Sequence, residues 1–369
     1  MKSLLLLSAG VAALATTPAF AEGHNTVLSG GTGVQLSFSG QVNRGVLFTD
    51  DGEETSTFFV DNDNSSTRFR ITADGDINEN WSAGVNIEVQ LESNSTANVS
   101  QDNPNPSSSD FLSERKMEAY IEGRNFGRLT FGQGDTASNG ASEADLSGTG
   151  VVGYSGVADA ASGIKFVNSG TLSDDTVGSA FTNLDGLSRR DRVRYDSPSL
   201  GGLTLSTSVG AGTAGDETFY DVAARYAGDF GGIKLDSAVA FSVNEADDET
   251  VNGSVSVLSQ DTGFSLTLAG GSKEFDAGGD DVTFGYVKAG YQTDTLTSLG
   301  KTAFAVDYAV NEDVLGRDDE STSYGFLAVQ NVNAIGTEFY AGLRNYELDV
   351  PGQDYDDVTA VLAGVRIKF

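Results

Sequence analysis

The stretch of sequence that decides the fold is Trp81-Ser82-Ala83-Gly84-Val85-Asn86-Ile87-Glu88-Val89-Gln90-Leu91. Its odd-numbered positions are apolar, and the even-numbered positions between them are small or polar. Because successive side chains of a β-strand point to opposite faces, this alternation predicts a strand with one apolar and one polar face. Strands of soluble proteins average about five or six residues, whereas a tilted strand that crosses a membrane needs about 9–11. The length of this stretch therefore predicts a membrane-spanning strand.

The same alternation recurs along the chain to its last residue. Further examples begin at Val34, Leu203, Ile233, Phe264, Phe304 and Val361. In the first of them Arg44 falls on the apolar parity, which predicts a β-bulge at that point. Seven short turns alternate with eight longer acidic loops, which lie roughly at 49–65, 93–112, 133–188, 210–217, 244–252, 270–281, 311–321 and 347–357. Such connections join sixteen strands in the pattern of outer-membrane barrels, so the sequence predicts an all-β, transmembrane antiparallel β-barrel of about 16 strands.

One of these loops differs from the others. Residues 133–188 are rich in glycine, serine, alanine and aspartate and have no strong strand pattern. A loop of this length in a compact structure is usually functional or disordered. Because it follows the fifth predicted strand, Arg128 to Gly132, it is the third long loop.

The composition excludes several classes of function. The chain has 369 residues with 22 Lys+Arg and 53 Asp+Glu, a formal net charge of −31, which argues against nucleic-acid binding because that needs a basic face. It has no cysteine, which excludes disulfides, thiolate metal sites and cysteine nucleophiles. Its single histidine, His24, lies in no predicted strand. A barrel enzyme such as a lipase or protease would need a Ser–His or Asp–His arrangement, so we predict that the protein is not an enzyme.

The first 21 residues have the features of a secretory signal. Lys2 is followed by an apolar stretch from Leu4 to Ala15, and Ala19-Phe20-Ala21 forms an A-x-A cleavage signature. A transmembrane helix is the alternative, but it needs about 20 apolar residues and this run is shorter. We therefore predict a signal peptide at residues 1–21 and a single barrel domain at residues 22–369.

Several short motifs are spread over this predicted mature chain. They are Phe38-Ser39-Gly40-Gln41-Val42-Asn43-Arg44-Gly45-Val46, Ser66-Thr67-Arg68-Phe69-Arg70, Phe126-Gly127-Arg128-Leu129-Thr130-Phe131-Gly132-Gln133, Arg192-Val193-Arg194-Tyr195-Asp196-Ser197-Pro198, Tyr226-Ala227-Gly228-Asp229-Phe230-Gly231-Gly232 and the terminal Phe369. With these motifs the chain resembles the general porins of Gram-negative outer membranes, in their trimeric proteobacterial branch. The resemblance implies a sixteen-stranded homotrimer in the cell outer membrane whose third loop, residues 133–188, folds into each barrel and narrows it. It departs from the commoner family pattern because that loop lacks a Pro-Glu-Phe-Gly-Gly stretch.

Two groups of arginines occupy one face of their predicted strands. One consists of Arg68 and Arg70, and the other of Arg190, Arg192 and Arg194. An arginine that faces lipid at mid-depth costs about 2–4 kcal/mol, so we expect both groups to face the lumen. By similarity with the family, they oppose acidic residues of the third loop. The candidates are Asp135, Glu143, Asp145 and Asp159, followed by Asp174, Asp175 and Asp185.

Opposed charges of this kind would create a transverse field that orients dipolar solutes. The alternative is that the arginines pair with carboxylates and simply hold the loop against the wall. By resemblance, Phe369 is the signal for the barrel assembly machinery; an aromatic residue at the membrane interface is the plainer interpretation. Glu245, Asp247, Asp248 and Glu249 are candidates for weak calcium or magnesium binding, with solvation of an exposed loop as the alternative. We expect no other cofactor.

The favoured function is a water-filled channel for passive diffusion of small hydrophilic solutes and ions, with a mild preference for cations. Its expected partners are two further copies in a homotrimer, outer-membrane lipid and lipopolysaccharide, the barrel assembly machinery and the solutes themselves. A substrate-specific porin is a close alternative. An exported soluble calcium-binding β protein would explain the acidity and the export, but it would not explain apolar strand faces of this length.

Overall fold

The structure is a computed structural model that describes residues 28–29, 33–106, 111–212 and 217–369. The predicted signal peptide and His24 lie outside the described residues. The elements in chain order are β1 (Leu28–Ser29), β2 (Val34–Asp50), β3 (Thr55–Asp61), η1 (Asp63–Ser65), β4 (Arg68–Asn78), β5 (Trp81–Leu91), β6 (Leu112–Gly123), β7 (Gly127–Asp135), η2 (Val157–Ala160), β8 (Lys165–Asn168), β9 (Thr171–Thr176), α1 (Val177–Ala180), β10 (Arg189–Asp196), β11 (Leu203–Ala211), β12 (Thr218–Asp229), β13 (Ile233–Val243), β14 (Glu249–Ser259), β15 (Phe264–Glu274), β16 (Val282–Thr293), β17 (Thr302–Glu312), β18 (Glu320–Val332), η3 (Asn333–Ile335), β19 (Thr337–Asp349) and β20 (Val358–Lys368).

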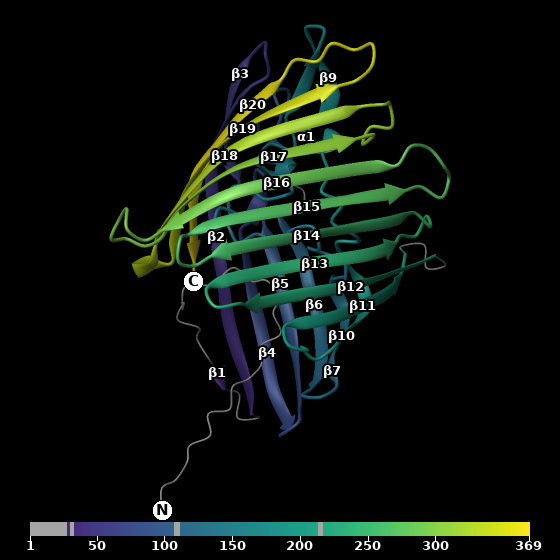
Figure 1. Cartoon of the computed structure of the whole chain (residues 1–369), viewed down its shortest axis with the longest axis vertical. Coiled ribbons are helices and arrows are strands. Elements are labelled where there is room, and N and C mark those ends of the chain that lie inside the picture. Colours follow the sequence, from purple (N-terminus) through teal and green to yellow (C-terminus); the bar gives the residue numbers. More distant parts are fainter. Residues whose placement is uncertain (1–27, 30–32, 107–110, 213–216) are drawn as a thin grey trace, which may run out of the picture.

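The long strands form one closed antiparallel barrel of sixteen positions, as the sequence predicts (Figure 1). β7 pairs with β10 across the third loop, and residues 41–50 of β2 pair with β20, which joins the last strand to the first. β3 and β4 both pair with β2 and share one position in the ring. A closed ring leaves no unpaired strand edge, which is the condition for a β structure in lipid. Among the described residues, no helix combines the length and hydropathy that a membrane crossing requires.

The structure corrects three details of the sequence interpretation. The predicted bulge at Arg44 is wrong, because β2 pairs without a register shift on both sides of that residue. The interruption lies instead in the neighbouring position of the ring, at residues 62–67 between β3 and β4. The predicted loop at 49–65 contains the end of β2 and all of β3, and the third loop begins at residue 136 because β7 continues to Asp135.

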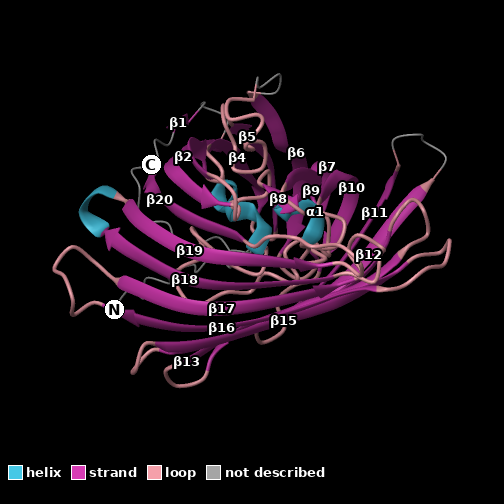
Figure 2. Cartoon of the chain, turned by 90° about the horizontal axis from the view of Figure 1, so that it is seen from above, coloured by secondary structure: helices cyan, strands magenta, loops and turns pink. Residues whose placement is uncertain are grey.

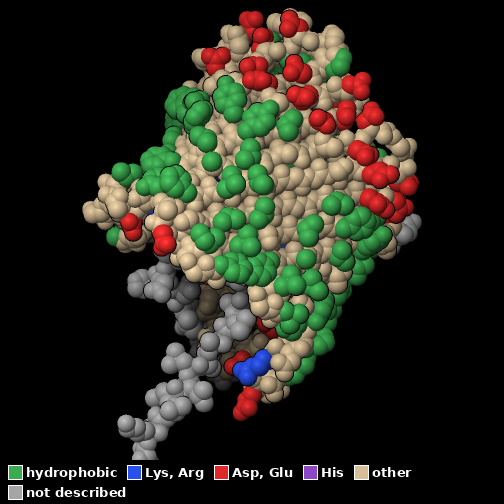
Figure 3. Space-filling model, in the orientation of Figure 1, with side chains coloured by type: hydrophobic (Ala, Val, Ile, Leu, Met, Phe, Trp, Pro, Cys, Tyr) green, Lys and Arg blue, Asp and Glu red, His purple; other side chains and the backbone are tan. Residues whose placement is uncertain are grey.

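The outer face of the barrel carries the apolar side chains that the alternation predicts. In β17, Phe304, Val306 and Tyr308 are exposed on this face, while Ala305 and Asp307 between them are buried. Figure 3 shows hydrophobic side chains over the strand wall and acidic side chains gathered towards the loops at its upper and right-hand rim. An apolar band with charges confined to its borders suits a surface that faces lipid.

The inner face is not uniformly polar, and this differs from a simple in–out alternation. Phe284, Leu327 and Tyr346 point inward from β16, β18 and β19 and are buried in one cluster with Phe166 and Phe181 of the third loop. Figure 2, which views the barrel from above, shows β8, β9 and α1 on the inner side of the ring of strands. The largest apolar core of the molecule therefore lies between the wall and the third loop, where burial of apolar surface holds the two together.

The chain end closes the seam between the first and last strands. Gly40 and Phe369 exchange two backbone hydrogen bonds, of 2.8 and 3.0 Å, and the Phe369 ring stacks on Phe38 with 6.0 Å between the ring centroids. A Cβ at position 40 would lie 2.8 Å from the Phe369 ring, so this close approach requires glycine.

We predict that Phe38 and Phe369 stabilise the barrel cooperatively. Single and double alanine substitutions, compared by denaturant unfolding in lipid bilayers, should give a coupling free energy of about 1 kcal/mol, the usual contribution of an aromatic pair. Phe131→Ala on β7, combined with Phe369→Ala, is the matched control and should be additive. Additivity of the Phe38 and Phe369 substitutions would contradict the prediction.

Candidate functional site

The third loop, residues 136–188, follows the inner wall of the barrel and is bonded to it through its own backbone. Ser208 accepts a hydrogen bond from the Ala137 N–H at 3.0 Å, and Ser256 accepts one from the Leu146 N–H at 2.9 Å. Further inward side chains that bond the loop backbone are Asp221, Arg225, Ser254, Lys288, Gln292, Asn311 and Tyr346. These residues belong to β11, β12, β14, β16, β17 and β19. Much of the inward polar surface therefore binds the loop.

Asp145, one of the predicted acidic residues, is one of these attachments. Its carboxylate lies 2.7 Å from the Lys288 ammonium group of β16, and the Lys288 side chain is completely buried. The Asp145 side chain itself is only 9% exposed. Asp145 thus contacts the wall beneath the loop and does not face the arginines of the sequence prediction.

The first predicted arginine group surrounds a buried carboxylate. Glu88 of β5 is 2% exposed and accepts a hydrogen bond from Arg70 Nε at 2.8 Å and one from Arg115 Nε at 2.7 Å. Arg68 Nε lies 4.0 Å from the same carboxylate. The three arginines and the glutamate together carry a net charge of +2. We call these four residues the arginine cluster.

Sequence alternation misses Arg115 of this cluster. Odd positions of β6 such as Met117 face outward, so strict alternation would place Arg115 outside the barrel. The β5–β6 register shifts between Glu88 and Val89, which leaves Arg115 without a pairing partner and turns its side chain towards Glu88. A bulge of this kind re-aims a side chain, and no residue type in the sequence marks it.

The second predicted group attaches the start of the third loop to the wall. Arg192 is 6% exposed; it binds Glu118 at 2.6 Å and the carbonyl oxygens of Gly132 and Asp135. Arg194 binds Asp196 at 2.7 Å and the carbonyl oxygens of Asp135 and Thr136. The partners of Arg192 all lie in β6 and β7, whereas Arg194 reaches Thr136, the first residue of the third loop. The bond from Arg194 to Thr136 fits the alternative interpretation, in which arginines hold the loop. The third member, Arg190, lies 3.0 Å from Glu245 of a different loop.

Asp135 is not a loop residue, which corrects its predicted position. It is the last residue of β7, where its carboxylate binds the Lys116 ammonium group and lies 4.0 Å from Arg189. Arg189 is a member of the wall that the sequence interpretation omitted. Arg189 directly precedes Arg190, so strict alternation places it on the opposite face of the strand from the predicted group.

Glu143, Asp159 and Asp185 of the third loop are partly exposed and share a raised pKa, and we call them the loop carboxylates. Burial raises the pKa of each of them. It raises the pKa of Asp159 to about 7, with the charge of Asp63 contributing further and a hydrogen bond from Tyr154 opposing the shift. For Asp185 the charge of Glu143 is the second cause of the increase in pKa. The pKa of each loop carboxylate therefore lies above that of an ordinary acidic side chain.

The remaining predicted acidic residues lie elsewhere. Asp175 binds Arg317 at 3.0 Å, and Asp174 lies 3.6 Å from Lys165. Of the four calcium candidates, Glu245 contacts Arg190 and Asp248 lies 2.9 Å from Lys273, so two of their carboxylates are engaged by different cations. Within the described ranges, the acidic groups close enough to share one ion are Asp280, Asp313 and Asp318. The predicted set is not brought together around a common point.

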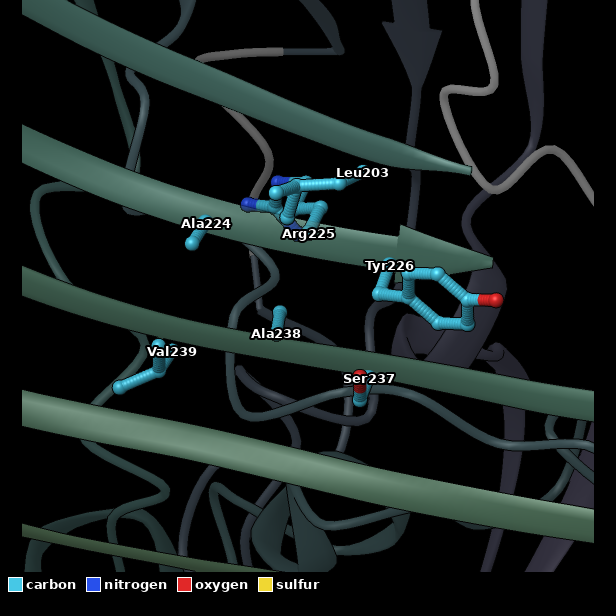
Figure 4. A pocket seen from close by; sticks show the side chains of 7 residues that line it. All are labelled: Leu203, Ala224, Arg225, Tyr226, Ser237, Ala238 and Val239. Carbon is cyan, nitrogen blue, oxygen red and sulfur yellow. The ribbon is translucent and has the colours of Figure 1, made fainter. Parts of the chain in front are cut away.

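A recess in the wall itself is a separate feature from these groups (Figure 4). It is lined by Leu203, Ala224, Arg225, Tyr226, Ser237, Ala238 and Val239 of β11, β12 and β13. Its only charged side chain is Arg225, whose guanidinium donates to the carbonyl oxygens of Ala137 and Asn139 in the third loop. Because ligand sites need several convergent polar groups, we do not assign a function to this recess.

Comparisons with known proteins agree with this architecture. The sequence profile of the Gram-negative porin family matches residues 8–350. The fold is similar to the anion-selective porin of Comamonas acidovorans, with a TM-score of 0.61, 14% identity, and coverage of 91% of this chain and 100% of that one. It is also similar to a trimer form of Vibrio cholerae OmpT, with a TM-score of 0.59, 14% identity, and coverage of 91% of this chain and 99% of that one. A third similar structure is Salmonella typhi OmpF in complex with daunomycin, with a TM-score of 0.58, 13% identity, and coverage of 93% of this chain and 100% of that one. No curated protein sequence matches the chain.

The profile match covers most of the chain, which therefore belongs to the Gram-negative porin family. The protein is an outer-membrane β-barrel channel, and its family and fold point to a channel rather than an enzyme. The structural neighbours include an anion-selective porin, so membership does not determine ion preference.

We predict that the ion preference of the pore depends on pH near neutrality. Asp159, with a pKa raised to about 7, is charged above that pH and neutral below it, so the pore should become less favourable to cations as the pH falls from about 8 to about 6. The measurement is the reversal potential in a salt gradient. Asp159→Asn should weaken this pH response. An identical response in the wild type and the variant would exclude Asp159 as its source.

Proposed function

We propose that the protein is a general-diffusion porin that passes small hydrophilic solutes and ions as a homotrimer. The observation that carries the proposal is that charged groups inside the closed barrel keep contact with solvent. Arg68, Arg70 and Arg115 point inward and retain 21%, 27% and 18% of their side-chain exposure. The loop carboxylates are likewise only partly buried. Charged, hydrated side chains inside a barrel are what a water-filled channel requires.

The two sets of groups support a pore with charge of both signs. The arginine cluster adds positive charge on β4 and β6, and the loop carboxylates add negative charge on residues 143–185 when they are ionised. A field between such groups favours hydrophilic, dipolar solutes and disfavours apolar ones, which must lose their hydration.

We propose further that the pore has a mild preference for cations. The chain carries a net charge of −31, and acidic side chains gather at the rim of the barrel, where they raise the local concentration of cations. The surplus of +2 in the arginine cluster opposes this effect, so the net preference is small.

We propose that the protein assembles as a homotrimer in the outer membrane. The trimer form of OmpT supports a homotrimer for this chain. We propose that outer-membrane lipid and lipopolysaccharide surround the trimer. We also propose that the barrel assembly machinery recognises Phe369, which is exposed at the end of the last strand pair.

Planar-bilayer recording of the purified protein tests the function. We expect stepwise, ohmic conductances that occur in threes, together with a small reversal potential of the sign for cation preference. Absence of insertion events from a folded, SDS-resistant preparation would contradict the channel, and a potential of opposite sign would contradict the ion preference alone.

A pair of variants locates the charges that set this potential. Arg68→Gln removes an inward positive charge and should shift the reversal potential further towards cations. Arg124→Gln is the matched control, because Arg124 is exposed in the turn between β6 and β7 and has no ion pair among the described residues. If both variants had the reversal potential of the wild type, the arginine cluster would not lie on the conduction path.

A further inference from the structure

Residues 145–153 of the third loop fit into a hollow of the wall formed by glycines. A Cβ at Gly290 of β16 would lie 2.9 Å from the Ser147 Cβ, and a Cβ at Gly342 of β19 would lie 2.9 Å from Val152 Cγ2. Both glycines point inward, and neither has a positive φ that would itself require glycine. Close approach of the loop explains why these wall positions have no side chain.

The two ends of this segment meet at one wall residue. Lys288 donates to the Asp145 carboxylate at 2.7 Å and to the Gly153 carbonyl oxygen at 2.7 Å. Its ammonium group therefore bridges two points that lie eight residues apart in the loop. The Lys288 side chain has no solvent exposure, so both contacts act without competition from water.

The side chain of Lys288 takes no part in the pairing of the wall strands. The β15–β16 and β16–β17 pairings use its backbone, and its side chain reaches only the loop among the contacts of the described residues. Loss of its charge leaves the Asp145 carboxylate with the Ser147 N–H, at 2.7 Å, as its remaining donor. A buried carboxylate without its cation is strongly unfavourable, so the segment is expected to leave the hollow more often while the barrel stays closed, although Ser256, Gln292 and the apolar core still contact it.

We propose that Lys288 is a positioning residue of the channel: by holding Asp145 and Gly153 it seats residues 145–153 in the wall and thereby determines how far the third loop narrows the pore. The proposal rests on the proposed channel function. The position of the third loop can also be measured without any ion current.

The first test measures current. Lys288→Met keeps the length and removes the charge. It should shift the equilibrium towards the displaced segment about tenfold, because a charge-assisted hydrogen bond contributes at least that factor, and the open-channel current noise should increase. Asp145→Asn should act in the same direction. Gly285→Val is the matched control on the same strand, since a Cβ there points outward and meets only Val310 Cγ1 at 3.5 Å. Wild-type noise in both Lys288→Met and Asp145→Asn would overturn the proposal.

The second test measures loop position by cross-linking. The chain has no cysteine, so the pair Val152→Cys and Gly342→Cys can form one unambiguous disulfide across the hollow. After reduction of the folded protein, the rate of re-oxidation reports how often the segment occupies the hollow. Adding Lys288→Met should slow re-oxidation, and the oxidised bridge should return the current noise of that variant to the wild-type level.

The two tests separate the possible failures. If the wild type conducts no current, the proposed function is wrong, while a slower re-oxidation with Lys288→Met would still support the role of Lys288 in positioning the loop. If the wild type conducts and re-oxidation is equally fast with and without Lys288→Met, the role of Lys288 is wrong and the channel stands.

Discussion

In lipid, every backbone N–H and C=O group needs a partner within the protein, and the ladder between β2 and β20 supplies the last set of these partners. Without it the sheet would have two open edges in the membrane. Once the ring is closed, each residue of a strand faces either lipid or the interior, and a single slip in register would exchange the two faces. The closed ring therefore determines which side chains can line a pore.

The same constraint applies to the third loop inside the barrel. A segment of more than fifty residues with little regular structure has many backbone groups to satisfy, and the wall satisfies them with side chains such as Ser208, Asp221 and Arg225. Small residues make this contact close: Ala137 and Ala141 of the loop pack on Ala223 and Ala240 of the wall. The glycine- and alanine-rich composition of the loop is thus explained by its fit to a surface, and it does not imply disorder.

Much of the fold follows from local pattern. Alternation over segments such as Trp81–Leu91 predicts the strands, and the contrast between long loops and short turns predicts their number, because both depend on residues close in sequence. The same local pattern places Arg68 and Arg70 inward, where they lie beside Glu88.

The contacts of the third loop could not be predicted in this way, because a segment without a period has no face that can be assigned. Asp145 and Asp159 are equivalent in sequence, yet one binds Lys288, 143 residues away, and the other stays near Tyr154 in its own loop. Arg115 escapes prediction for a different reason, namely a bulge that depends on the pairing of two strands. In both cases the deciding interaction is long-range.

Solute entry into proteoliposomes tests whether the barrel keeps an open aqueous path beside the third loop. Reconstituted vesicles are placed in sugars and amino acids of graded size, and swelling is followed over time. With an open path, the rates of swelling should decrease with solute size and increase linearly with solute concentration. Rates equal to those of protein-free vesicles, from a preparation that retains the folded barrel, would contradict it.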